Sequence, residues 1–129
     1  MKAAQEDYDG GYLASVRSLV SAELFSSELE QADELLRAGF HVAAAVIAGT
    51  VLETTLRTLC TAHGQPLTGL NRMNDDLAKA GVYNALEKKN VTAMAGIRNA
   101  AAHGQTSDFT AAQVEAMLRD VTRFVAEHT

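Results

Sequence analysis

The sequence has little cysteine and little proline, and each scarcity excludes a class of structure. Because Cys60 is the only cysteine, the chain forms no internal disulfide. The only proline, Pro66, lies in the segment 64–69, whose composition predicts a loop. The four histidines are scattered without the spacing of zinc ligands, so we expect no bound metal and no other cofactor. These histidines are His41, His63, His103 and His128.

The sequence also lacks a long hydrophobic run and an excess of basic residues. Its longest apolar run, residues 42–48, is far shorter than the roughly 18 residues of a membrane span, so we expect no membrane partner. The first seven residues lack a basic segment followed by an apolar one, which predicts no secretion signal and a cytoplasmic location. The net charge is −5, and the acidic excess lies wholly in residues 1–65, so a polybasic surface that grips duplex nucleic acid is excluded.

Apolar residues recur at helical spacing through most of the chain. No segment alternates with period two, and the valines and isoleucines lie inside helical patterns, so the sequence predicts an all-α fold. Residues 1–129 are long enough to form one domain that buries roughly two thirds of its unfolded surface. We expect an antiparallel bundle of four or five helices, with the loops at Pro66 and Gly104 at its corners.

The first helical pattern runs from Tyr8 to Leu36, and its apolar stripe shifts by one residue midway. Either one long helix bends near Ser26 and Ser27, or a new helix begins at a capping box of Ser27 and Glu30. The acidic residues here are expected on a solvated face. The stripe consists of Leu13, Val16, Val20 and Leu24, then Phe25, Leu29, Ala32 and Leu36.

Small or apolar side chains cover nearly the whole circumference of the second predicted helix, Phe40 to His63. This pattern is typical of a central helix, whose neighbours approach closely at residues such as Gly49. Glu53 is the exception, since a carboxylate buried alone is unfavourable. We expect it to pair with Arg57, one turn later; Arg98, on another helix, is the alternative partner.

Three further helices follow. Asn71 or Asn74 is expected to cap a short one that ends at Ala80, with two aspartates in its first turn. The next has a predicted buried stripe of Val82, Leu86, Ala93, Ile97 and Ala101, interrupted by an exposed polar stretch at residues 88–90. In the last, residues 109–114 carry a capping box and a hydrophobic staple. Its predicted stripe is Val114, Met117, Leu118, Val121 and Val125, with Arg119 and Arg123 on a solvated face.

The segment Ile97 to Gly104 places a fixed cation, an amide and an imidazole among small residues. Arg98 and His103 are about 140° apart around an ideal helix, whereas Asn99 and His103 share a face. In a straight helix of one copy, the side chains of Arg98 and His103 therefore do not point toward each other. Either the helix ends near residue 102 with Gly104 as a left-handed cap, or the arginine reaches round, or two chains pool these side chains.

The alanine-rich run at residues 40–49 followed by Glu53, with Arg98, Asn99 and His103 some 45 residues later, resembles the HEPN family of helical domains. The match covers most of the chain from about residue 29 onward. In that family, an arginine, the polar residue after it and a histidine four to six positions beyond the arginine form the active site of metal-independent endoribonucleases. The resemblance implies that Arg98, Asn99 and His103 are catalytic, in a toxin or defence type of enzyme. It also implies a homodimer whose two motifs share a cleft, with Glu53 near Arg98.

This activity suits the chemistry of the three side chains. RNA supplies its own nucleophile, the 2′-hydroxyl, so that a proton carrier such as His103 and a cation such as Arg98 cleave it without a metal. Arg98 would hold the phosphate oxygens as negative charge accumulates, and Asn99 would orient the histidine or bind phosphate. Two copies would supply one histidine for each proton transfer.

A non-catalytic HEPN-like module for dimerisation or for binding a nucleotide or another ligand is the alternative. In it, Arg98 and His103 would satisfy carbonyls at the helix end, and Asn99 would bond Glu53. One toxin branch of the family pairs with a nucleotidyltransferase that modifies a tyrosine two positions after the motif histidine. Gln105 occupies that position here, which argues against that arrangement. The expected partners are RNA or a nucleotide, a second copy, and a protein antitoxin whose nature the sequence does not specify.

Overall fold

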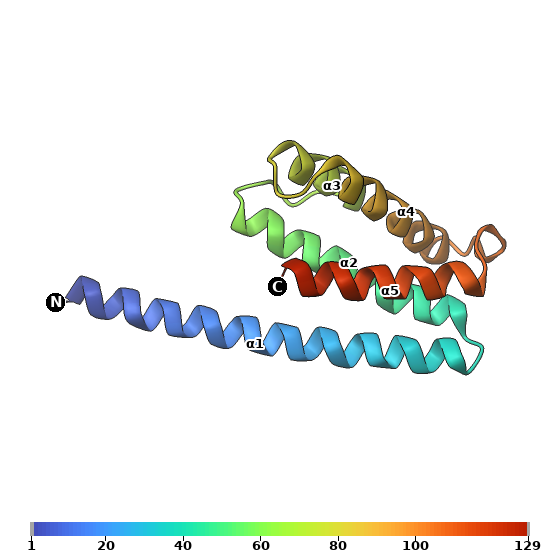
Figure 1. Cartoon of the computed structure of the whole chain (residues 1–129), viewed down its shortest axis with the longest axis horizontal. Coiled ribbons are helices and arrows are strands. Elements are labelled where there is room, and N and C mark those ends of the chain that lie inside the picture. The colour runs from blue at the N-terminus through green and yellow to red at the C-terminus, as the bar shows by residue number, and fades with distance from the viewer. Residues whose placement is uncertain (1, 129) are drawn as a thin grey trace.

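The second helix, α2 (His41–Ala62), lies at the centre of the structure and packs against all four other α-helices (Figure 1). The computed structural model describes the backbone of residues 2–128 and the side chains of residues 16, 19, 20 and 22–128. The other elements are α1 (Lys2–Arg37), α3 (Leu70–Lys79), α4 (Ala85–Ala102), the 3-10 turn η1 (Thr106–Asp108) and α5 (Ala111–His128). Residues 2–128 contain no strand, so the predicted all-α bundle of four or five helices is confirmed.

The chain reverses direction at each of the longer connections. Figure 1 shows α2 returning antiparallel along α1, and α4 running antiparallel to both α2 and α5. The loops that contain Pro66 and Gly104 make two of these turns, as predicted. Because α3 packs on α2 and α4, and α1 on α2 and α5, α1 and α4 lie on opposite sides of the central pair.

The central position of α2 follows from its small and apolar side chains. Its buried residues cover several sides of the helix, so the prediction of a central helix is confirmed. By length and composition alone, α2 is also apolar enough to cross a membrane, with a mean hydropathy of 1.4. The core helix of a folded domain is also long and apolar enough, and half of the apolar stretch of α2 is buried inside the bundle. The contacts of α2 therefore favour a core role.

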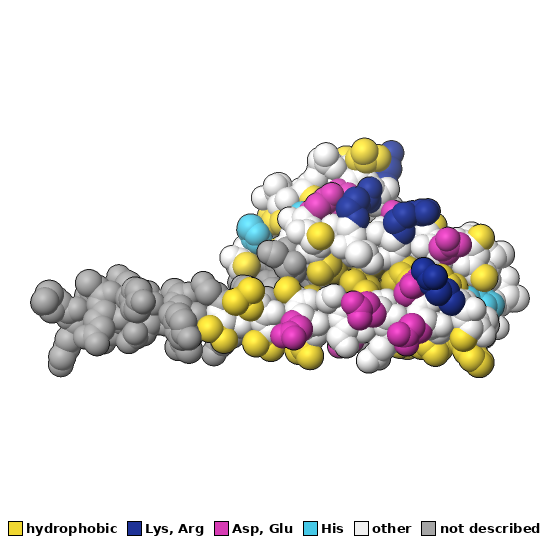
Figure 2. All heavy atoms as spheres, turned by 60° about the horizontal axis from the view of Figure 1, so that its bottom comes forward, with side chains coloured by type: hydrophobic (Ala, Val, Ile, Leu, Met, Phe, Trp, Pro, Cys, Tyr) yellow, Lys and Arg dark blue, Asp and Glu magenta, His cyan; other side chains and the backbone are white. Residues whose placement is uncertain are grey.

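The helix α1 passes through Ser26 and Ser27 without interruption, so the predicted helix start at Ser27 is not observed. The second half of the predicted stripe is buried at Phe25, Leu29 and Ala32. The first half is wrong at Val16, Val20 and Leu24, which are exposed together with Leu19 because α1 extends past the ends of the other helices (Figure 1). Figure 2 shows exposed hydrophobic side chains on the described part of α1. The predicted stripe residue Leu13 has a side chain outside the described set.

The prediction that Asn71 or Asn74 caps α3 is wrong, because α3 begins before both and no side chain caps it. The buried amide of Asn74 joins helices instead. Its Nδ2 donates to the carbonyl oxygen of Lys88 and to Oγ1 of Thr92, both at 3.1 Å, and the Tyr83 hydroxyl donates to its Oδ1 at 2.6 Å. Burial raises the pKa of Tyr83 far above its usual range, which keeps this hydroxyl a donor at neutral pH.

The predicted buried stripe of α4 is confirmed in part. Ala101 is buried, and Val82 and Ile97 pack partly buried against the core, whereas Leu86 is 68% exposed and Ala93 is exposed. Val91, Met94 and Ala95 face the core in their place. Since Arg98 follows Met94 by four residues, it falls on the same inward face. The buried residues of α4 are Val91, Met94, Ala95 and Ala101.

The last helix, α5, matches its prediction closely because its signals are local. The Gln113 amide N–H donates to Thr110 Oγ1 at 3.2 Å, and the Thr110 amide N–H donates to Gln113 Oε1 at 2.8 Å, which completes the capping box. The staple residues Phe109 and Val114 are both buried. All five predicted stripe residues are buried, and Phe124 joins them; Arg119 and Arg123 are exposed, as expected.

Candidate functional site

The helices α2 and α4 cross where Arg98 lies on Gly49. A Cβ atom built on Gly49 would lie 2.8 Å from the Cβ of Arg98, 3.5 Å from its Cα, and in severe overlap with its Cγ. The absence of a side chain at residue 49 is therefore what lets α4 approach α2 this closely. The predicted close approach at Gly49 is confirmed, and its partner is the aliphatic part of an arginine.

The guanidinium of Arg98 reaches Glu53, which lies one turn after Gly49 on α2. Arg98 Nη2 donates to Glu53 Oε2 at 2.7 Å, and Arg98 Nη1 donates to Asn99 Oδ1 at 3.1 Å. The expected pair of Glu53 with Arg57 is wrong, and the alternative partner Arg98 is the one observed. The reason is the crossing of α2 and α4 at Gly49, which brings Arg98 of α4 within hydrogen-bond distance of the Glu53 carboxylate.

Burial of the ion pair is partial, since the side chains of Arg98 and Glu53 are 31% and 30% exposed. An arginine has five N–H donors, and the two contacts to Glu53 and Asn99 use two of them. The guanidinium is therefore held in place on one side and remains open to an anion on the other.

Asn99 lies between the ion pair and a surface hollow. Its Oδ1 accepts from Arg98, so the expected bond from Asn99 to Glu53 is not the one formed. Asn99 also lines a cavity of about 310 Å³ between the outer part of α4 and the segment that follows it, which contributes Gln105, Asp108 and Phe109. The amide thus connects the held arginine to a space large enough for a small ligand group.

His103 ends α4 and is exposed. Gly104 has φ +72°, the left-handed conformation that favours glycine, and its N–H donates to the carbonyl oxygen of Ala101 at 3.3 Å. The predicted helix end near Ala102 with Gly104 as cap is confirmed. No hydrogen bond or ion pair of the His103 imidazole occurs among the residues with described side chains.

One copy of the chain therefore brings three of the four predicted site residues together. Glu53, Arg98 and Asn99 form one connected group, whereas His103 lies about 140° around α4 from Arg98. The surface of α4 on the side of His103 is lined by small residues: Ala93 and Gly96 are exposed, and a Cβ at Gly96 would meet nothing within 4 Å. This surface leaves room for close approach by another molecule.

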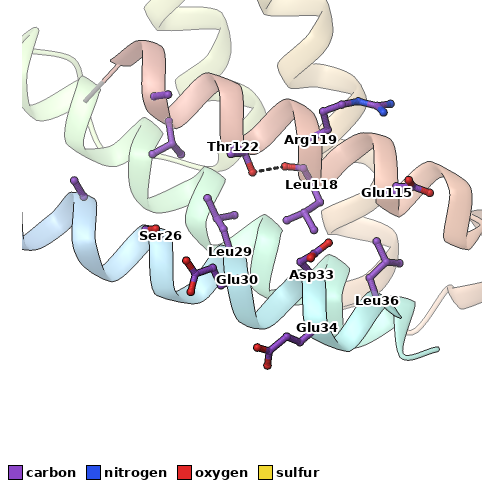
Figure 3. A pocket seen from close by; sticks show the side chains of 13 residues that line it. Ser26, Leu29, Glu30, Asp33, Glu34, Leu36, Glu115, Leu118, Arg119 and Thr122 are labelled. Carbon is purple, nitrogen blue, oxygen red and sulfur yellow. Dashed lines mark hydrogen bonds between the residues drawn. The ribbon is translucent and has the colours of Figure 1, made fainter. Parts of the chain in front are cut away.

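A larger groove lies elsewhere, between α1 and α5, with a volume of about 760 Å³ (Figure 3). Figure 3 shows Leu29 and Asp33 of α1 directed toward Leu118 of α5. Four carboxylates and one basic side chain, Arg119, line this groove, so it repels phosphate groups. The carboxylates are Glu30, Asp33, Glu34 and Glu115.

Two further groups of reactive side chains lie away from Arg98. Cys60 is fully buried, and burial together with the charge of Asp76 raises its pKa, so its thiol is not an accessible nucleophile. Glu87, Glu127 and His128 form a cluster of metal-ligating side chains at the opposite end of α4. Sequence reasoning missed this cluster, because 40 positions separate Glu87 from Glu127 and no local spacing connects them.

Comparison with known proteins gives no relative for this chain: no protein-family model, no curated protein and no solved structure matches it.

The crossing of α2 and α4 is tested by two glycine substitutions. We expect Gly49→Ala to lower the free energy of unfolding by about 1–3 kcal/mol, because the new methyl group overlaps Arg98 and forces α4 outward. The matched change Gly96→Ala, on the open face of α4, should raise it by about 0.5–1 kcal/mol through helix propensity. Urea unfolding followed by circular dichroism measures both, and a stabilising Gly49→Ala would contradict the close crossing.

The partner of Glu53 is tested by a double-mutant cycle. Glu53→Gln and Arg98→Met remove the charges while keeping the side-chain length, and we expect a coupling of about 0.5–1 kcal/mol, modest because the pair is one-third exposed. The control cycle combines Glu53→Gln with Arg57→Met and should give a coupling close to zero. A larger coupling in the control cycle would show that the local pair dominates in solution.

Proposed function

We propose that this chain is a metal-independent endoribonuclease, of the toxin or defence type, whose active site is shared by two copies. The observation that supports this most is that Glu53 and Asn99 hold the guanidinium of Arg98, about one-third exposed, on the same helix that ends at the exposed His103. A positioned cation and a free proton carrier are the two groups that cleavage of RNA by its own 2′-hydroxyl requires.

The reaction follows from these groups. His103 of one copy removes the proton from the 2′-hydroxyl, whose oxygen attacks the adjacent phosphorus. The remaining N–H donors of Arg98 stabilise the negative charge that gathers on the phosphate oxygens. His103 of the second copy protonates the departing 5′-oxygen, so the products are a 2′,3′-cyclic phosphate and a 5′-hydroxyl end. No step requires a metal ion.

A second copy is needed because of the angle between Arg98 and His103 on α4. A two-fold axis beside the small residues of α4 would place the histidines of both copies next to a shared groove. Gly96 lies on this surface, and its lack of a side chain favours close helix contact. In this proposal the enzyme works in the cytoplasm on RNA, with a protein antitoxin as a further partner.

A non-catalytic module for dimerisation or nucleotide binding is the second candidate. The ion pair of Arg98 and Glu53 favours it, because the pair joins α4 to α2 and partly neutralises the arginine. The net charge of −5 and the acidic groove between α1 and α5 also oppose general RNA binding. The two candidates differ in one measurable property, the dependence of RNA cleavage on His103.

The nuclease proposal is tested on a mixed RNA in excess chelator. We expect the unmodified protein to cleave it and to leave cyclic phosphate ends, and we expect Arg98→Ala and His103→Ala each to lower the rate about 100-fold or more. Arg57→Ala and His63→Ala, which change the same residue types at exposed positions, should keep full activity. Full activity in either site variant would eliminate this site, and a folded, dimeric but inert protein would leave the binding module.

The shared cleft is tested by the oligomeric state. Sedimentation at micromolar concentration should show a dimer, and Gly96→Leu should give a monomer with unchanged helical circular dichroism and lost cleavage, because the added side chain blocks the open face of α4. Ala62→Leu, at the exposed end of α2, serves as the control and should remain a dimer. An active monomer would rule out catalysis by two copies.

A further inference from the structure

Three side chains at the end of the bundle farthest from Arg98 along α4 converge on one point. Glu87 belongs to the first turn of α4, whereas Glu127 and His128 belong to the last turn of α5. One ligand atom from each, two carboxylate oxygens and an imidazole nitrogen, lies within 4.8 Å of the others. The packing of α4 against α5 creates this group from residues that are distant in sequence.

The carboxylate of Glu87 has one oxygen without a partner. Its Oε2 accepts a long hydrogen bond of 3.5 Å from Asn90 Nδ2, while its Oε1 is buried and has no hydrogen-bond partner. A buried carboxylate oxygen without a partner is unfavourable, because it has lost its hydration and formed no hydrogen bond to replace it. A cation bound by this carboxylate would compensate for that loss.

His128 is positioned by aromatic contacts. Its ring centroid lies 4.5 Å from that of Phe124 and 5.8 Å from that of Tyr83, whose hydroxyl is itself fixed by Asn74. These contacts restrict the rotation of the imidazole. A ligand that is already oriented loses less conformational freedom when it binds a metal.

The charges around the group favour a cation. The carboxylates of Glu87 and Glu127 lie close together, and Glu127 is at the carbonyl end of α5, whose negative dipole end favours a cation; the start of α4 at Glu87 offsets part of this effect. Arg123 lies 3.9 Å from Glu127 and equally far from Asp120, and Lys88 pairs with Asp75 at 3.3 Å. Among the described side chains, no basic group forms an ion pair with Glu87.

We propose that Glu87, Glu127 and His128 bind one zinc ion, with water as the fourth ligand. One imidazole nitrogen and two carboxylate oxygens suit Zn²⁺, whereas Ca²⁺ and Mg²⁺ require six or more oxygen ligands. Zinc bonds of about 2.1 Å place ligand atoms about 3.4 Å apart in a tetrahedron, so small rotations of the side chains close the site. The ion ties the start of α4 to the end of α5.

This zinc site is independent of the proposed nuclease. Arg98 lies eleven residues after Glu87 on the same helix, which corresponds to about 16 Å. Zinc therefore contributes to folding stability and takes no part in RNA cleavage. Failure of one proposal leaves the other standing, because stability and cleavage are measured separately.

The test uses full-length protein freed of metal with chelator and then dialysed. Titration calorimetry with zinc chloride should give one ion per chain, and zinc at about 100 times its Kd should raise the Tm by about 5–10 °C. Magnesium chloride should give no such rise. Glu87→Gln and His128→Gln should each abolish the zinc-dependent rise, measured against the metal-free Tm of the same variant.

Matched variants separate a specific site from general metal binding. Glu115→Gln on α5 and His63→Gln after α2 change exposed residues of the same types and should keep the full zinc-dependent rise. A rise that persists in both Glu87→Gln and His128→Gln would overturn the proposal, as would the absence of binding in the unmodified protein. If either Glu87→Gln or His128→Gln fails to fold, the zinc-dependent rise in Tm of the other variant tests the site.

Discussion

The structure depends on the contact between Gly49 of α2 and the side chain of Arg98 on α4. Because residue 49 has no side chain, the two helices approach until the aliphatic part of the arginine lies against the α2 backbone. This approach fixes the rotation of α4 about its own axis. It carries the guanidinium to Glu53 and leaves His103 about 140° away, on the open side of the helix. The arrangement of the candidate site therefore follows from one missing side chain.

Apolar burial holds α4 in place, and the ion pair adds to the orientation that packing sets. Val91, Met94 and Ala95 are essentially buried, and at about 25 cal/mol per Å² their buried surface outweighs the 0.2–1 kcal/mol typical of a partly exposed ion pair. The pair still matters for specificity, because Glu53 would otherwise be a half-buried carboxylate without a partner. Packing thus provides most of the stability and sets the rotation of α4, and the ion pair compensates the charge of Glu53 in that rotation.

Sequence reasoning succeeded where the signals were local. The capping box and stripe of α5, the end of α4 at Gly104 and the central role of α2 all depend on residues within a few positions of one another. It was wrong where contact with a distant helix determines the role of a residue. Asn74 is a residue type that often caps helices, yet its side-chain amide donates to α4 instead. The apolar residues of α4 lie on two faces of the helix, and only the contact with α2 shows which face is buried. The preference for Arg57 over Arg98 failed for the same reason, since nearness in sequence says nothing about a crossing helix.

The distribution of charge restricts where an RNA strand can approach. Figure 1 places α1 and α4 on opposite sides of α2 and α5, so the carboxylates that line the groove between α1 and α5 lie away from the outer face of α4. A chain of net charge −5 repels a polyanion, so an RNA strand needs an exposed cation in order to bind. Small, uncharged residues such as Gly96 lie on the open face of α4, whereas Arg98 lies on the inward face, where Glu53 partly neutralises it. In the proposed dimer, the second copy would add a second arginine as well as a second histidine, so the electrostatics and the proton chemistry of the proposal favour the same arrangement.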